Sequence, residues 1–279
     1  MKDNLRLGEY ILPIGERTCI MGVLNVTPDS FSDGGMYMDP ARAAEKAVEM
    51  EAEGADIIDV GGESSRPGSR RVSLDEELNR VIPVIRRLKK TVSVPVSIDT
   101  YKSEVARQAL IEGASMVNDI TALKGDARMA RTIAEFDAGV AIMHMKGTSE
   151  TMQEEPRYDD VMEEILAHLS EAVDLAVEAG VDPDRIIVDP GIGFGKTLEH
   201  NLVILRQLSL LERLGRPILI GTSRKSFIGT LTGKDAGERS FGTAASFTAA
   251  IINGADIIRA HDVGRMRDVT RVADAIKRM

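Results

Sequence analysis

The residues of this sequence best suited to chemistry are polar side chains that end short apolar runs. Asp99, Asn118 and Asp189 each stand at the end of such a run. An amide side chain offers both a donor and an acceptor, whereas an ionised carboxylate only accepts hydrogen bonds. This combination suits the edge of a flat heterocycle that carries an amino group and ring N–H groups.

A second group of candidates is cationic. Arg66, Arg259 and His261 follow other apolar runs, and the arginine guanidinium matches phosphate oxygens with two parallel hydrogen bonds. Asn25 ends the first apolar run, and its amide oxygen could ligate Mg2+, a cation that is often bound by few protein ligands together with substrate phosphate. Together these residues indicate a small polar substrate that carries phosphate, with Mg2+ as the cofactor.

A repeated unit positions these residues. The segment 54–60, Gly-Ala-Asp-Ile-Ile-Asp-Val, recurs as Gly-Ala-Asp-Ile-Ile-Arg-Ala at 254–260, with a looser copy at 113–119. Each copy follows an amphipathic stretch and combines a glycine turn, typical of a helix end, with a continuous apolar strand. The unit therefore predicts a helix, a turn and a strand buried on both faces.

Eight such strands alternate with helical patterns. The predicted strands cover 19–25, 57–60, 96–99, 116–119, 139–144, 186–189, 218–222 and 257–260. The predicted helices cover 40–53, 74–90, 102–112, 126–137, 158–179, 199–214, 240–253 and 264–278. This alternation predicts an α/β fold, a (β/α)8 TIM barrel that uses residues 1–279 as one domain. A doubly wound open sheet is the alternative, but the Gly-x-Gly-x-x-Gly turn expected after its first strand is absent.

In such a barrel the carboxyl ends of all strands meet at one rim, which is where active sites lie. A ring of polar residues at that rim is hard to explain by structure alone, because buried polar groups are costly unless they are paired. For a single residue the structural explanation stays open: Asp99 could instead cap the helix that follows it. The glycine-rich segment 191–197 lacks the Walker spacing. His168 and His200 are expected on the solvated surface.

Composition excludes several classes of function. The chain has 279 residues with 35 basic and 44 acidic side chains, so its net charge is −9, and we expect no nucleic-acid partner. No apolar run is long enough to span a membrane. Cys19 is the single cysteine, which favours a reducing compartment, and we expect a cytoplasmic protein. The four histidines show no zinc-ligand spacing.

Five segments resemble the signatures of dihydropteroate synthases, in the family's order. The first, Met-Gly-Val-Leu-Asn-Val-Thr-Pro-Asp-Ser-Phe-Ser-Asp-Gly-Gly at 21–35, is long and highly specific. The others lie at 61–68, 189–196, 223–226 and 259–263. The resemblance implies a transferase of folate biosynthesis. This enzyme would join 7,8-dihydropterin-6-ylmethyl diphosphate to 4-aminobenzoate, which sulfonamides mimic, and would release pyrophosphate and 7,8-dihydropteroate.

The resemblance also implies a role for each matching residue. The pterin would be held by Asp99, Asn118, Met143, Asp189 and Lys225. The diphosphate would be held by Asn25, Ser65, Arg66, Arg259 and His261, with Asn25 contacting Mg2+. The 4-aminobenzoate would be held by Asp33, Ser65, Pro67, Phe194, Lys225 and Ser226. Asp99, Lys225 and Asn25 would be the catalytic residues, and a homodimer through the outer helices is expected.

Two departures and two rival hypotheses accompany the resemblance. Ser65 stands where the family usually has threonine, and Ser149 where proline is common. A pterin-binding methyltransferase domain would share the barrel, but it would need neither the cationic cluster nor the long first signature. A non-catalytic pterin-binding barrel would be expected to lose at least one of the diphosphate-binding residues.

Overall fold

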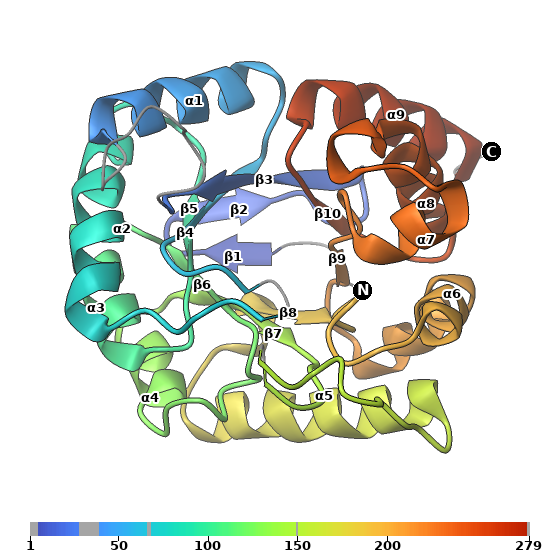
Figure 1. Cartoon of the computed structure of the whole chain (residues 1–279). Helices are drawn as coiled ribbons and strands as arrows, with labels where there is room; N and C mark the ends of the chain where they lie inside the picture. Colours follow the sequence, from blue (N-terminus) through green and yellow to red (C-terminus); the bar gives the residue numbers. More distant parts are fainter. Residues whose placement is uncertain (1–4, 28–38, 66–67, 149, 278–279) are drawn as a thin grey trace.

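The central sheet consists of eight parallel strands. The computed structural model describes residues 5–27, 39–65, 68–148 and 150–277 (Figure 1). The strands are β3 (Cys19–Asn25), β4 (Ile57–Gly61), β5 (Val96–Asp99), β6 (Met116–Asp119), β7 (Gly139–Met143), β8 (Ile186–Asp189), β9 (Leu219–Ile220) and β10 (Ile257–Ala260). Their order is β8-β7-β6-β5-β4-β3-β10-β9, and a bridge between Val188 and Ile218 joins the two ends. The strands thus close a barrel.

Helices connect the strands and form the outer ring (Figure 1). They are α1 (Pro40–Ala52), α2 (Leu74–Leu88), α3 (Ser103–Glu112), α4 (Met129–Glu135), α5 (Val161–Glu178), α6 (Leu198–Arg206), α7 (Ser226–Thr232), α8 (Ser240–Ile252) and α9 (Val263–Lys277). The predicted (β/α)8 barrel is confirmed, and the alternative of an open sheet is wrong. In the described residues no helix is long and apolar enough to cross a membrane.

The repeated glycine turns have the backbone that the sequence implied. Gly54, Gly113 and Gly254 have φ values of 104°, 114° and 111°. Each glycine lies between the end of a helix and the start of a strand. Only glycine adopts this left-handed region without steric cost. The three turns therefore return the chain from the outer ring to the barrel.

Several elements differ from the prediction. The predicted helix 199–214 divides into α6 and a 3-10 helix at Leu208–Leu214, and β9 is shorter than the predicted strand 218–222. Helix α7 was not predicted. Nor was an antiparallel hairpin formed by β1 (Leu5–Leu7) and β2 (Tyr10–Leu12). Leu5 and Leu7 are fully buried in one apolar cluster with the barrel interior, so the hairpin extends the inner core of the barrel.

Candidate active site

Four polar side chains form one layer inside the barrel. Buried apolar residues stand in β4, β6, β8 and β10, and all four belong to the interior cluster: Ile57, Met116, Ile187 and Ile257. Residues two apart in a strand face the same side, so the residue two positions later also faces inward. Those residues are Asp59, Asn118, Asp189 and Arg259. Alternate strands supply each interior layer of such a barrel, and here the layer above the apolar one is polar.

A cavity lies above this layer. Nine predicted site residues line it: Ser65, Asp99, Asn118, Met143, Asp189, Phe194, Lys225, Arg259 and His261. Met143 and the apolar Val23, Ile120 and Ile192 also face the cavity. The cavity thus combines apolar side chains with carboxylates, an amide and cations, as binding sites for small polar molecules usually do.

Asn25 lies beside this cavity rather than among its lining residues. In the sheet register Asn25 pairs with Gly61, and Gly61 pairs with Asp99. A Cβ atom placed on Gly61 would lie 3.7 Å from both Asn25 Oδ1 and Asp99 Oδ2. The amide of Asn25 and the carboxylate of Asp99 therefore both lie close to the same glycine at the rim.

The remaining predicted residues are placed less directly. Ser226 is the first residue of α7 and is exposed, and it does not belong to the described lining of the cavity. Asp33, Arg66 and Pro67 lie outside the described residues.

Arg259 is held between two carboxylates. Its Nε donates to Asp59 Oδ2 at 2.6 Å and its Nη2 donates to Asp99 Oδ2 at 2.7 Å. Burial disfavours the charge of this guanidinium, but Asp59 and Asp99 raise the pKa of Arg259 above its ordinary value. Burial also raises the pKa of Asp99, and Arg259 opposes that rise. Asp99 therefore bonds Arg259 and does not cap α3, whose N-cap residue, Lys102, makes no side-chain capping bond.

Asp59 was missed by sequence reasoning. It is fully buried, and its Oδ2 atom also accepts a hydrogen bond from Asn118 Nδ2 at 3.1 Å. The same carboxylate oxygen thus orients one candidate pterin ligand and one candidate diphosphate ligand. A signal was present, because a carboxylate within a buried apolar strand is costly unless it is paired.

Lys225 reaches the cavity from a constrained loop. Its Nζ lies 4.0 Å from the centroid of the Phe194 ring, a cation–π contact. Burial lowers the pKa of Lys225 to about 8, and Asp189 opposes this change. The preceding residue, Arg224, has a φ of 59°, which is unfavourable for a side chain with a Cβ. Arg239 Nη1 donates to the carbonyl oxygens of Arg224 and Lys225. A side chain from a later segment of the chain therefore stabilises this turn.

His261 and Asp189 are also oriented by neighbours. His261 Nδ1 lies 2.9 Å from Ser223 Oγ, which fixes the plane of the ring. Asp189 Oδ1 accepts a hydrogen bond of 2.7 Å from the backbone N–H of Gly191. Burial nevertheless raises the pKa of Asp189. The rim thus presents these polar groups in defined orientations.

A buried pair lies beside the cavity. Lys196 Nζ is 2.9 Å from His144 Nδ1 and donates to the carbonyl oxygen of Phe194 at 2.9 Å. Burial lowers the pKa of His144 to about 2, so its neutral ring can accept from the lysine. The glycine-rich segment 191–197 thus turns its lysine inward.

His168 and His200 are not solvated surface residues. His168 is half-buried against the His144 ring and His200 caps α6, so the prediction that both are solvated is wrong.

The arrangement suits a reaction in which a negatively charged group leaves without protonation by a strong acid. Cations on one side of the cavity can stabilise negative charge that develops on phosphate, and carboxylates deeper inside can stabilise positive charge on a ring. No group of three or more His, Cys, Asp or Glu side chains is placed to hold a metal ion within the described ranges.

Comparison with known proteins narrows the range of reactions that this cavity could support. Residues 21–261 match the family model described as pterin binding enzyme. A dihydropteroate synthase from Synechocystis is 48% identical over 275 residues, covering 98% of this chain and 95% of the relative.

Two solved structures share the fold closely. One is a Yersinia pestis dihydropteroate synthase in complex with a sulfonamide drug, with a TM-score of 0.94, 38% identity, and coverage of 99% of this chain and 100% of the other. The second is a Xanthomonas albilineans dihydropteroate synthase with 4-aminobenzoic acid, with a TM-score of 0.93, 41% identity, and full coverage of both chains, 100% each.

Proposed function

The chain belongs to the pterin-binding enzymes and, within them, to the dihydropteroate synthases, and on this premise we propose how its own residues carry out the reaction. The substrates are 7,8-dihydropterin-6-ylmethyl diphosphate and 4-aminobenzoate, and the products are 7,8-dihydropteroate and pyrophosphate. The observation that carries the assignment of roles is the polar layer, in which Arg259, Asp189 and Asn118 line a single cavity. The fourth member, Asp59, accepts hydrogen bonds from Arg259 and Asn118.

The pterin ring fits the deepest part of the cavity. Asn118 and Asp189 are buried there, and together they offer the donors and acceptors that an aminated heterocycle requires. Because Asn118 Nδ2 is engaged by Asp59, its Oδ1 is the atom available to accept from a ring N–H. Lys225 donates to a ring acceptor, and the thioether of Met143 packs against the face of the ring.

The diphosphate fits the cationic side of the rim. Arg259 and His261 lie there together, with Ser65 on the neighbouring loop, and we propose Arg66 as a further ligand. Asn25 would hold Mg2+. Its neutral amide oxygen, which lies near the carboxylate of Asp99 at Gly61, fits an ion that takes most of its ligands from phosphate and water. The ion would supply charge neutralisation at the leaving diphosphate.

The 4-aminobenzoate fits the outer part of the same cavity. Phe194 and Lys225 form a cation–π pair there, so the ring offers an apolar surface beside an ammonium group that can pair with the benzoate carboxylate. Ser65 lines the facing wall, and we propose Ser226, Asp33 and Pro67 as its neighbours. Sulfonamides, which share the arylamine shape, would compete at this position.

The reaction begins with departure of the diphosphate. The bond between the methylene carbon and the bridging oxygen breaks, and its electron pair leaves with pyrophosphate, whose charge Arg259 and His261 stabilise. The pterin methylene becomes a delocalised cation, and Asp99 faces it with a carboxylate. The amine nitrogen of 4-aminobenzoate then forms the new C–N bond and loses one proton to solvent. No strong general base is needed, because the amine attacks in its neutral form.

We also propose where the protein acts and how it assembles. Burial raises the pKa of the Cys19 thiol to about 12, an inert thiol that suits the reducing cytoplasm. Apolar side chains are exposed on α8 and α9: Phe241 by 85%, Val272 by 60% and Ile276 by 58%. We propose that these outer helices, which lie side by side (Figure 1), bury these side chains in a homodimer, and that the whole chain acts as one barrel domain.

Formation of dihydropteroate from the two substrates tests the proposal. Purified protein with Mg2+ should convert labelled 4-aminobenzoate into dihydropteroate, and a sulfonamide should inhibit competitively with 4-aminobenzoate. Binding of pterin with no turnover would favour a non-catalytic barrel. Transfer of a methyl group to a corrinoid acceptor would favour the methyltransferase hypothesis.

A further inference from the structure

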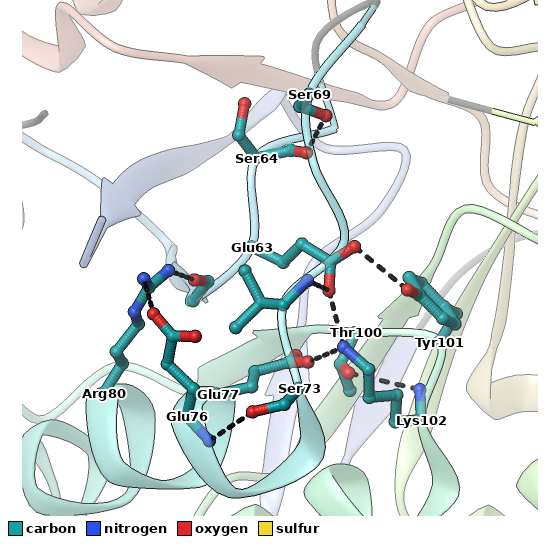
Figure 2. A network of polar contacts seen from close by, with 12 residues as sticks. Glu63, Ser64, Ser69, Ser73, Glu76, Glu77, Arg80, Thr100, Tyr101 and Lys102 are labelled. Carbon is teal, nitrogen blue, oxygen red and sulfur yellow. Dashed lines mark hydrogen bonds and ion pairs between the residues drawn. The ribbon is translucent and has the colours of Figure 1, made fainter. Parts of the chain in front are cut away.

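A second polar network lies beside the cavity and joins two loops (Figure 2). The carboxylate of Glu63, just after β4, accepts from Tyr101 Oη at 2.9 Å, from Lys102 Nζ at 2.5 Å and from the backbone N–H of Val72 at 3.2 Å. Glu63 and Val72 stand at opposite ends of the segment that connects β4 to α2. One carboxylate therefore ties both ends of this connection to the start of α3.

Lys102 is the centre of this network. Its ammonium contacts both Glu63 and Glu77, and Glu77 is only 1% exposed (Figure 2). Burial raises the pKa of Glu77, and Lys102 opposes that rise. Without the ammonium, two carboxylates with little access to water would face each other, and each would lose its charge partner. Removing the ammonium therefore costs more than breaking an exposed ion pair.

Further bonds keep the same connection in place. Arg80 Nη1 donates to the carbonyl oxygen of Gly62 at 2.7 Å. Ser69 Oγ donates to the carbonyl oxygen of Ser64 (Figure 2). These contacts hold the described residues on both sides of Ser65.

The network also adjoins residues that line the cavity. Ser65, two residues after Glu63, lines both the main cavity and a smaller adjoining one that Glu63 and Tyr101 also line. Asp99, three residues before Lys102, lines the same two cavities. The position of the Ser65 wall relative to Asp99 is thus set through the contact of Glu63 with Lys102.

We propose that Lys102, acting through Glu63, is a positioning residue that sets the wall of the 4-aminobenzoate site. The inference rests on the proposed function, because it assigns Ser65 to that site. Lys102 touches neither substrate. Of the pterin ligands only Asp99 lies near it in the chain, and Asp99 is held by its own contact with Arg259, whereas Asn118, Asp189 and Lys225 lie on other strands and loops. Its loss therefore weakens arylamine binding and leaves pterin binding intact.

The test measures the affinity for 4-aminobenzoate separately from the affinity for the pterin. In Lys102→Met and in Glu63→Gln, we expect the KM for 4-aminobenzoate to rise about tenfold, because a charge-assisted contact is lost. The dissociation constant of 6-hydroxymethyl-7,8-dihydropterin, measured by calorimetry, should stay unchanged. Lys102→Arg, which can still bridge both carboxylates, should restore most of the affinity.

Glu112→Gln is the matched control. It removes an exposed pair in which Arg86 of α2 bonds Glu112 of α3 at 2.9 and 2.6 Å, so it loosens the same two helices far from the cavity wall. This variant should keep the KM of the parent. The inference is overturned if Lys102→Met and Glu63→Gln match Glu112→Gln in KM and differ from it only in Tm. If Lys102→Met does not fold, the shape-conserving Glu63→Gln decides alone. A parent protein that makes no dihydropteroate would instead refute the proposed function.

Discussion

Asp59 and Arg259 occupy the same position in two copies of a repeated segment, and they form a salt bridge of 2.6 Å across the barrel although 200 residues separate them. Asn118 holds that position in the third copy and donates to the same carboxylate oxygen. Equivalent positions of a repeated strand belong to one layer of the barrel interior. The repeat thus places opposite charges where they meet, and the pair orients a cation at the rim.

Asp59→Asn tests this arrangement. In this variant Arg259 keeps its contact with Asp99 but loses its shorter contact, the one with the charged carboxylate of Asp59. We therefore expect the guanidinium to be less well placed for the diphosphate. The value of kcat/KM for the pterin diphosphate should fall between about tenfold and a hundredfold, the range of a hydrogen bond to a charged group. Steady-state kinetics at saturating 4-aminobenzoate would measure it.

Asp56→Asn provides the comparison for Asp59. Asp56 lies at the other end of the same repeat copy and pairs with Arg17 at 2.5 Å. Its loss should lower Tm without changing the kinetics. Equal kinetic effects from the two variants would contradict the role given to Asp59.

Asp99→Asn tests the stabilisation of the pterin cation. The amide keeps the shape of the side chain but removes the negative charge, so kcat should fall about a hundredfold. The dissociation constant for the pterin should change far less, because the cation exists only during the reaction. Single-turnover kinetics would separate the two effects. Full retention of kcat would mean that this carboxylate does not stabilise the reacting ring.

The pH dependence should report Lys225. Burial lowers the pKa of this lysine to about 8, so its ammonium is complete below that pH and is lost as the pH rises through it. We expect kcat/KM to fall above pH of about 8, approaching a tenfold loss per further pH unit. In Lys225→Arg the guanidinium stays charged, and the basic limb should move to higher pH. A parent profile that is flat to pH of about 9.5 would be inconsistent with a required ammonium.

Ser65→Thr introduces the methyl group that the resemblance to the family leads us to expect at this position. This methyl would add apolar contact at the cavity wall, where Ile120 also lies. The KM for 4-aminobenzoate should fall by at most about fourfold, the value of one buried carbon, with kcat unchanged. Ser64→Thr, in a residue that lines only the smaller cavity, should have no such effect. A higher KM in Ser65→Thr would show that the wall has no room for the methyl.

Sequence patterns predicted the strands of the barrel more reliably than its other elements, for a physical reason. A strand covered on both faces is apolar along most of its length. The runs 19–25 and 186–189 are apolar up to their last residue, so the sequence itself shows where these strands end. The hairpin of β1 and β2 has only three residues in each strand and mixes charges with leucines. Its strands form because the barrel interior buries Leu5 and Leu7, which local sequence does not show.

The same limit applies to the site. Polar groups at strand ends, such as Asn118 and Asp189, could be predicted because the fold brings strand ends together. For Asp59 the sequence indicates that a buried carboxylate needs a partner, but it does not show which residue is that partner. The network around Lys102 joins residues 63, 72, 77 and 102 only after folding. The pairing of Arg259 with two carboxylates also depends on closure of the barrel. Such contacts are set by tertiary structure and not by spacing along the chain.

The central claim is tested most directly by measuring pyrophosphate and dihydropteroate together in one reaction. The protein would be incubated with Mg2+, 7,8-dihydropterin-6-ylmethyl diphosphate and 4-aminobenzoate, alongside Arg259→Ala and Lys225→Ala. We predict equal amounts of both products from the parent protein and almost none from either variant. Pyrophosphate released without dihydropteroate, or equal activity in the two variants and the parent, would contradict the account.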